Sequence, residues 1–398
     1  MSAIPAGYKQ TDVGVIPLGW SVKRIGELAT VGSGGTPSRE NAAYWNGDIP
    51  WITTSQINFN TITEADQFIS VVGLKNSAAK LLPAGTLLMA LYGQGKTRGK
   101  VGVLGFEAAT NQACASISPT GDISPEFLLH YLASRYEAIR NSSNTGSQEN
   151  LNGQIVKDTP VVFPPILEQR AIAAALSDVD ALLAKLDQFI AKKRDLKQAA
   201  MQQLLTGQTR LPGFGNAWEV KRLGEVAEIV MGQSPSSSNY NTKGLGLPLT
   251  QGNADIVNRK TIRRIFTTEI TKRGKCGDIL MSVRAPVGEI SRAVFDVCLG
   301  RGVCAIRYPN DFLYHFLVSQ EPSWAKLSKG STFDSVNSAD VKALEIRLPR
   351  DEEEQTAIAT VLFDMDAELA NLEARRDKTR ALKQGMMQEL LTGRIRLI

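Results

Sequence analysis

Basic and amide side chains gather in the loops of both halves of this 398-residue chain. Arginine and lysine neutralise phosphates and bind guanine edges, and the amides of asparagine and glutamine bind adenine in a bidentate way. These residue types therefore predict contacts to double-stranded DNA. The candidates are Thr53, Thr54, Gln56, Asn58, Lys96, Arg98 and Lys100 in the first half, and Gln251, Asn253, Arg259, Lys260, Arg263, Arg264 and Arg284 in the second half.

Each of these residues, taken alone, is more often part of a solvated surface than of a binding site. The net charge of +5 is compatible with a polyanionic partner but does not require one. The recurrence of the same residue types in both halves, in loops of unlike sequence, favours DNA contact.

The sequence contains few segments that resemble motifs for catalysis or cofactor binding. Residues 93–97, GQGKT, resemble a phosphate-binding loop, but Ala90 occupies the position where that motif requires its first glycine. The two histidines, His130 and His315, lie at equivalent places in apolar segments, which is more typical of core residues than of a general base. The cysteines include no CxxC pair. We therefore predict no catalytic residue, no metal site and no cofactor.

The cysteine pattern and the hydropathy indicate the compartment. The segment MSAIPAGYKQ lacks the basic and apolar blocks of a signal peptide, and no apolar run reaches about 18 residues. Four cysteines without a pairing pattern are typical of a reducing environment. We expect a soluble cytoplasmic protein with no membrane contact.

Two long segments that repeat each other are expected to position the candidate residues. Residues 168–211 and 354–397 match without a gap at a constant offset of 186 residues, from EQ at the start to LLTG near the end. Such a match indicates a duplicated supersecondary unit. Each segment is predicted to be a helix that ends near Gly207 or Gly393, and about 38 helical residues would span roughly 55 Å.

Apolar residues in both segments alternate in steps of four and three, which is the heptad pattern of paired helices. The predicted interface consists of Ile172, Leu176, Val179, Leu183, Leu186, Ile190, Ile358, Leu362, Met365, Leu369 and Leu372. Acidic residues precede basic residues in each segment, so an antiparallel pair would bring opposite charges together. The alternative is two amphipathic helices that pack separately on globular cores. The matching seams favour an intramolecular antiparallel coiled coil.

The repeat extends into the globular segments before each helix. AWEVKRLGEVA at 217–227 repeats part of the sequence that begins at Trp20. NQACASI at 111–117 aligns with RGVCAIR at 301–307, which predicts that Cys114 and Cys304 occupy equivalent positions in the two repeats. Two hairpins and two short core helices are also predicted. The hairpins are expected at 84–104 and 276–294, the helices at 127–132 and 312–317, and polar loops at 144–153 and 329–338. The predicted fold class is α+β, with two similar domains, two long helices and a pseudo-twofold internal repeat.

The order of these segments, found twice, resembles the specificity (S) subunits of type I restriction–modification systems. The resemblance covers essentially the whole chain and rests on GVIPLGWSVKRIGELA and AWEVKRLGEVA at the domain starts, GDILM at 277–281, and EQRAIAAALSDVDALLAKLD and EQTAIATVLFDMDAELANLE, each with an LKQ…M…LLTG ending. It implies two mixed α/β target recognition domains, at 1–165 and 208–350. It also implies two conserved spacer helices, at 166–207 and 351–398, that form the antiparallel coiled coil.

The resemblance further implies a function. Members of the family read a bipartite double-stranded DNA target, one half-site for each domain, and their helix pair fixes the gap between the half-sites. The helices dock two modification (methyltransferase) subunits, and restriction (motor-nuclease) subunits join the larger complex. S-adenosylmethionine would bind the modification subunit, so the resemblance implies a non-catalytic chain with no cofactor of its own.

Two alternatives come from other classes of protein. A coiled-coil scaffold that assembles protein partners without DNA contact would keep the helices but would not need basic, amide-rich loops. A methyltransferase or a nuclease would need a cofactor loop or a set of metal-binding carboxylates, which the motifs do not indicate. We favour DNA recognition over both.

Overall fold

The computed structural model describes residues 4–93, 96–142, 150–330 and 336–397, and only the helical backbone of 323–330. Gln94 and Gly95 of the GQGKT segment lie outside the described residues. The same holds for residues 144–149 and 331–335 of the two predicted polar loops.

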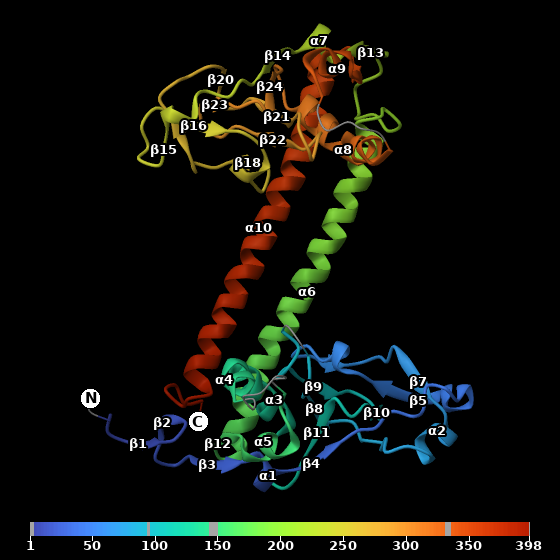
Figure 1. Cartoon of the computed structure of the whole chain (residues 1–398), viewed down its shortest axis with the longest axis vertical. Coiled ribbons are helices and arrows are strands. Elements are labelled where there is room, and N and C mark those ends of the chain that lie inside the picture. Colours follow the sequence, from blue (N-terminus) through green and yellow to red (C-terminus); the bar gives the residue numbers. More distant parts are fainter. Residues whose placement is uncertain (1–3, 94–95, 143–149, 331–335, 398) are drawn as a thin grey trace. The chain divides into compact units, whose positions relative to one another are not determined.

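The chain forms two compact units that share both long helices. Unit 1 contains Met1–Asp187 and Arg375–Ile398, and unit 2 contains Gln188–Ala374. Helices α6 (Ile166–Leu204, green in Figure 1) and α10 (Glu352–Leu390, red in Figure 1) each contribute a segment to both units. These units divide the chain within the helices, whereas the four predicted segments divide it at the helix ends.

The globular part of unit 1 consists of a five-stranded sheet (β4-β11-β8-β9-β6), a three-stranded sheet (β10-β5-β7) and the pairs β1–β2 and β3–β12. Its strands are β1 (Tyr8–Thr11), β2 (Gly14–Pro17), β3 (Ser21–Arg24), β4 (Ala29–Ser33), β5 (Trp45–Ile52), β6 (Thr61–Ile62), β7 (Gln67–Ile69), β8 (Leu87–Ala90), β9 (Val101–Leu104), β10 (Ala109–Thr110), β11 (Cys114–Pro119) and β12 (Pro160–Phe163). Its helices are α1 (Ile25–Leu28), η1 (Ala42–Tyr44), η2 (Thr54–Gln56), α2 (Val71–Lys75), α3 (Pro125–Ser134), α4 (Tyr136–Asn141) and α5 (Gly153–Asp158).

Unit 2 repeats this plan with a six-stranded sheet (β14-β24-β21-β22-β18-β17), a five-stranded sheet (β15-β19-β16-β23-β20) and the pair β13–β25. Its strands are β13 (Trp218–Arg222), β14 (Glu228–Met231), β15 (Tyr240–Asn241), β16 (Leu247–Thr250), β17 (Ile256–Val257), β18 (Lys260–Thr261), β19 (Phe266–Thr267), β20 (Arg273–Gly274), β21 (Ile279–Ser282), β22 (Ile290–Arg292), β23 (Val297–Leu299), β24 (Val303–Arg307) and β25 (Glu345–Pro349). Its helices are α7 (Leu223–Val226), η3 (Ser237–Asn239), η4 (Asn253–Asp255), α8 (Phe312–Gly330) and α9 (Ser338–Ala343).

Both predicted hairpins and both predicted core helices are confirmed. Strand β8 pairs with β9 and β21 with β22, all antiparallel, and helices α3 and α8 cover the expected segments. The alignment of Cys114 with Cys304 is wrong by one residue. Cys304 pairs with Met281 and packs against the helices, whereas Cys114 pairs with Ala90 and faces the other side of its sheet. The two cysteines are identical in type, but the register of each strand determines which face of the sheet a residue occupies.

In unit 1 the segments of α6 and α10 run antiparallel. Three ion pairs show the direction. As the residue numbers rise along α6, those of the partners in α10 and just beyond its end fall. The pairs are Glu168–Arg396, Asp180–Lys383 and Asp187–Arg376. Ile172 and Leu176 of α6 pack in one core cluster with Leu390 and Leu391, so the apolar stripe of each helix is buried against the other and against the globular part.

In unit 2 the two helical segments also run antiparallel. Lys193 pairs with Glu368, Lys197 with Asp366, and Arg210 with Glu354. The Asp180–Lys383 and Lys197–Asp366 pairs are related by the 186-residue offset, as are Glu168–Arg396 and Glu354–Arg210. The prediction that acidic and basic segments face each other is therefore confirmed.

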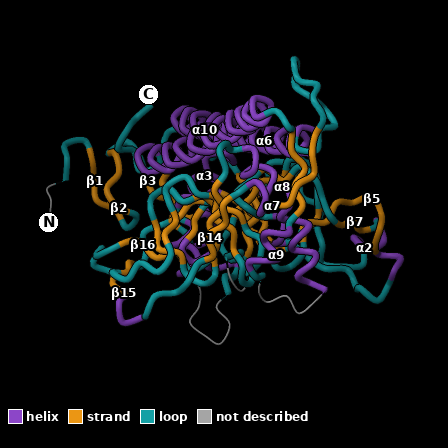
Figure 2. Tube along the Cα trace, turned by 90° about the horizontal axis from the view of Figure 1, so that it is seen from above, coloured by secondary structure: helices purple, strands orange, loops and turns teal. Residues whose placement is uncertain are grey.

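The seam residues differ in burial. Ile172, Leu176, Leu186, Ile190, Ile358, Leu362 and Leu369 are buried, and Val179, Leu183, Met365 and Leu372 are half-buried. Gly207 and Gly393, predicted to end the helices, both have φ of +72°, the left-handed conformation that glycine adopts without strain. Gly393 lies against Pro17 and Trp20, and its carbonyl accepts a hydrogen bond from Tyr8 Oη at 2.9 Å. Figure 2 shows the C-terminal residues beside the β1–β2 hairpin.

The two histidines are buried where a short helix of each unit meets a long one, as the sequence predicted for core residues. His130 lies 3.2 Å from Ser177 Oγ, and burial lowers its pKa to about 4, assisted by the positive charge of Lys383. Burial also lowers the pKa of His315 to about 4. The carboxylates of Asp180 and Asp366 oppose these shifts without cancelling them.

We expect the stability of the chain to fall in mild acid because of these histidines. Between pH 6.5 and pH 4 the unfolded chain binds protons that the folded chain does not, so the stabilisation present above pH 6.5 is lost as the pH falls towards 4. Lowering the pKa from 6.5 to about 4 corresponds to a free-energy difference of about 3 kcal/mol for each histidine. Urea unfolding at pH 7, 5.5 and 4.5 measures this effect, with His130→Gln and His315→Gln as neutral variants. An equal decline in the variants would show that other groups cause the pH dependence.

Candidate nucleic-acid interface

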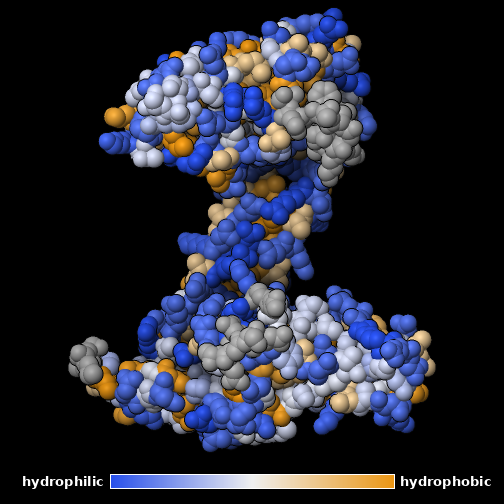
Figure 3. Space-filling model, in the orientation of Figure 1, coloured by the Kyte–Doolittle hydropathy of each residue, from blue (hydrophilic) through white to orange (hydrophobic). Residues whose placement is uncertain are grey.

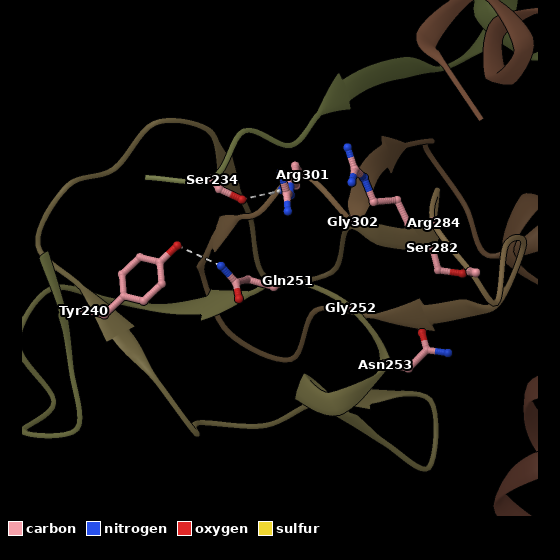
Figure 4. Close-up of a pocket in the computed structure, with 10 residues that line it drawn as sticks. Ser234, Tyr240, Gln251, Gly252, Asn253, Ser282, Arg284, Arg301 and Gly302 are labelled. Atoms are coloured by element: carbon pink, nitrogen blue, oxygen red, sulfur yellow. Dashed lines mark hydrogen bonds between the residues drawn. The ribbon is translucent and has the colours of Figure 1, made fainter. Parts of the chain in front are cut away.

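A polar pocket of about 370 Å³ lies in unit 2, where several strands end. Its lining comes from the loop after β14, from β15, from the turn after β16, from the turn after β21 and from the turn before β24 (Figure 4). The lining residues are Ser234, Tyr240, Gln251, Gly252, Asn253, Ser282, Arg284, Ala285, Arg301 and Gly302. Segments distant in sequence thus place two arginines, two amides and hydroxyl groups around one opening.

The turn that carries the two amides is held by a buried carboxylate. Asp255 accepts hydrogen bonds from the backbone N–H of Gln251 and from Nε of Arg264, both at 2.8 Å. The Gln251 side chain donates from Nε2 to Tyr240 Oη at 2.8 Å. Asn253 donates from Nδ2 to Glu289, and its Oδ1 is buried without a hydrogen-bond partner among the described residues. The Asn253 amide oxygen therefore keeps a hydrogen-bonding capacity that no described group of the domain uses.

The turns that carry the arginines are equally constrained. Ser282 Oγ donates to the carbonyl of Pro286 at 2.6 Å and accepts from the N–H of Glu289 at 3.0 Å, which closes the turn that contains Arg284. The N–H of Arg301 donates to Ser234 Oγ at 3.2 Å. At Gly302 a Cβ atom would lie 2.0 Å from the carbonyl oxygen of Gln251, so only glycine permits this close approach.

Three of the predicted contact residues, Gln251, Asn253 and Arg284, meet at this pocket. The other basic candidates of unit 2 lie elsewhere. Arg259 forms a two-pronged ion pair with Glu321 at 2.5 and 2.7 Å, and Arg264 pairs with Asp255. Both guanidinium groups therefore hold the domain together. Arg263 lies over the ring of Phe295 at 4.5 Å, and Lys260 is exposed on β18.

The predicted contact residues of unit 1 lie around η2 and in the segment before β9. Around η2, Thr53 and Thr54 are half-buried, and Gln56 donates to the carbonyl of Glu64. Lys100 Nζ donates to Asn58 Oδ1 at 2.8 Å. Lys96 is exposed and Arg98 is buried.

Sequence reasoning missed Ser234, Tyr240 and Arg301. The strand registers show which residue of unit 1 corresponds to Arg301. In the register of the parallel pairs, Thr250 faces Leu299 as Ile52 faces Thr110. Counting from these pairs places Arg301 where unit 1 has Gln112. A basic residue in place of an amide at equivalent positions of a repeat indicates a difference in what each half binds.

The described helices include none that is both long enough and apolar enough to cross a membrane. Among the described residues there is also no group of three or more histidine, cysteine or acidic side chains arranged to hold a metal ion.

Comparison with known proteins gives a consistent result for the whole chain. The chain is 28% identical over 98% of its length to a Methanocaldococcus jannaschii protein assigned as the MjaX type I restriction enzyme specificity subunit, of which 97% is covered. A solved structure concerned with complex assembly and conformational transition of the type I restriction–modification system contains a chain with 25% identity and a TM-score of 0.62, covering 96% of this chain and 99% of that one. The S subunit of a type I system from M. genitalium shares the fold, with 16% identity and a TM-score of 0.63 over 96% of this chain and 97% of its own.

A family model matches the chain twice, at residues 17–193 and 216–379, so each match begins in a globular part and runs into a long helix. The two matches correspond to the two copies of the internal repeat, and together they include most of the chain. The chain therefore belongs to the family of type I restriction modification DNA specificity domains.

Proposed function

We propose that this chain is the DNA-reading specificity subunit of a type I restriction–modification system. The observation that carries the proposal is the twofold match to the specificity-domain family over two repeats of one fold. In this proposal residues 1–165 and 208–350 are target recognition domains, and residues 166–207 and 351–398 are spacer helices. Each domain reads one half of a bipartite target, and the helices fix the distance between the halves.

The chain itself is proposed to be non-catalytic and cytoplasmic, with methylation and cleavage performed by partner subunits. Two modification subunits would dock on the helices, and restriction subunits would join the larger complex. Several large apolar side chains are exposed along α6 and α10, and a docked subunit would bury them. They are Leu167, Leu182, Phe189, Leu196, Phe363 and Leu382. In Figure 3 the visible face of the helices is mostly hydrophilic, with some apolar residues among the polar ones.

Methylation mapping tests the proposed function. The chain is expressed with the modification subunit of its own system in a strain that lacks other adenine methyltransferases, and methylated adenines are mapped across the genome. We expect one asymmetric motif with two defined half-sites separated by unspecified bases. The modification subunit expressed alone serves as the control and should leave no motif. A continuous motif, or the same motif without the chain, would contradict the proposal, and absence of methylation together with absence of DNA binding by the complex would favour the scaffold alternative.

A further inference from the structure

We propose that the unit 2 pocket reads a G·C base pair in the DNA half-site of that domain, and that Arg284 and Arg301 contact guanine. This inference rests on the proposed function and assigns a G·C base pair to one of the two half-sites.

The two pocket arginines differ from five other arginines of their domain in having no ion-pair partner. Arg259, Arg264, Arg273, Arg292 and Arg307 all form ion pairs with acidic residues of unit 2. Over the described residues, the guanidinium groups of Arg284 and Arg301 form no hydrogen bond or ion pair, and both side chains are exposed. Their planar donors are available for the paired acceptors that guanine presents, O6 and N7.

The amides favour a base edge over a phosphate as the bound group. Asn253 Oδ1 is a buried acceptor without a partner, and Glu289 fixes the orientation of that side chain. A phosphate carries only acceptors and would leave this oxygen unsatisfied. A G·C pair offers acceptors on guanine and the N4 amino donor on cytosine, which matches a pocket with arginine donors on one side and an amide acceptor on the other. Figure 4 shows Arg284 and Arg301 on one side of the pocket and Asn253 on the other.

Comparison with unit 1 shows that this chemistry is specific to one domain. Ser282 pairs with Val303 as Ala90 pairs with Cys114, so Arg284 corresponds to Tyr92. By the same registers Arg301 corresponds to Gln112. The scaffold of the two domains is shared, whereas the side chains at these turns are unlike. Guanine-binding arginines therefore occur at these positions only in unit 2, and the inference concerns only the half-site that unit 2 reads.

The first experiment uses wild-type complex, the chain with its modification subunit, and duplex oligonucleotides that carry the mapped motif. Each guanine of the motif is replaced in turn by 7-deazaguanine, which lacks the N7 acceptor but retains Watson–Crick pairing. In the half-site that unit 2 reads, we expect one or two replacements to weaken binding roughly tenfold to a hundredfold, the value of a bidentate arginine–guanine contact. A motif whose half-sites both lack guanine and cytosine would overturn the inference at once.

The second experiment assigns those guanines to residues. Arg301→Gln places in unit 2 the residue that unit 1 carries, and glutamine binds adenine rather than guanine. We expect methylation mapping of this variant to show a guanine-to-adenine change, or loss of preference, at one position while the other half-site stays the same. Arg284→Lys and Arg301→Lys keep the charge but lose the bidentate geometry, so they should also lose the discrimination.

Lys275→Ala is the matched control, because it removes one exposed positive charge of the same domain outside the pocket. It should leave the motif unchanged. If the arginine variants weaken binding equally on all sequences and lower the salt slope by about one, the pocket binds phosphate and the inference is wrong. If they change neither binding nor motif, the pocket is not at the interface. In both cases a bipartite wild-type motif would still support the proposed function.

Discussion

Replacing Arg396 with alanine is expected to destabilise unit 1 by about 1–3 kcal/mol, the usual cost of leaving a buried polar group without its hydrogen-bond partner. The carboxylate of Glu168 is fully buried and accepts from Arg396 Nη2 at 2.7 Å and from Trp20 Nε1 at 2.9 Å. Without the guanidinium group, this carboxylate stays away from water with only the indole as donor. Arg210→Ala should have a similar effect in unit 2, because Arg210 donates to the fully buried Glu354 at 2.5 and 2.6 Å.

Chemical unfolding monitored by tryptophan fluorescence measures this loss. Arg394→Ala is the matched control, because Arg394 lies two residues away and pairs with Glu389 on the surface, where an ion pair contributes about 0–1 kcal/mol. The double variant Arg396→Ala with Glu168→Gln should recover part of the loss, because a neutral amide needs no counter-charge. Equal unfolding midpoints for Arg396→Ala and Arg394→Ala would show that the Glu168 pair does not stabilise the fold.

The second large effect is expected in the number of base pairs between the two half-sites of the DNA target. If the helices fix the distance between half-sites, seven residues inserted into α6 after Asp187 should shift or abolish the preferred spacer, with both half-site sequences unchanged. Insertion of one heptad into each helix, after Asp187 and after Ala374, keeps the heptad register and adds about 10.5 Å. This length corresponds to roughly three base pairs at about 3.4 Å each.

Methylation mapping reads both results. A two-residue insertion at the same points serves as the control, because it turns the apolar seam by about 200° away from the partner helix and should abolish methylation. The half-site sequences provide an internal check that each domain still folds and reads its bases. An unchanged spacer in the double-heptad variant would show that something other than the helices sets the distance.

The elements predicted well from the sequence were those specified by local periodicity. The heptads of α6 and α10, the apolar strands of the two hairpins and the core histidines depend on residues near one another in the chain. Duplication reinforced each signal, because the same pattern appeared twice. The misaligned Cys114 shows the limit, since strand register is decided by the pairing partner and not by the identity of the residue.

The pocket was predicted only in part because it is assembled by tertiary structure. Tyr240, Gln251 and Arg301 come from separate strands, and only the packed sheets bring them together. Local composition also selected Arg259 and Arg264 without showing that they face Glu321 and Asp255. A cluster of basic residues in the sequence therefore identifies a candidate DNA-binding domain. Side chains that have no hydrogen-bond partner within the fold identify the candidate contact residues.

The sharing of the long helices between the units has a consequence for biosynthesis. Leu390 and Leu391 are part of the core that surrounds Ile172 and Trp20, and they follow the whole of unit 2 in sequence. On the ribosome, unit 1 is made first but cannot close its core until these residues emerge, whereas unit 2 is contiguous and can complete its contacts earlier. A nascent chain released before residue 390 would leave the N-terminal domain with an open apolar face and expose it to chaperones and proteases.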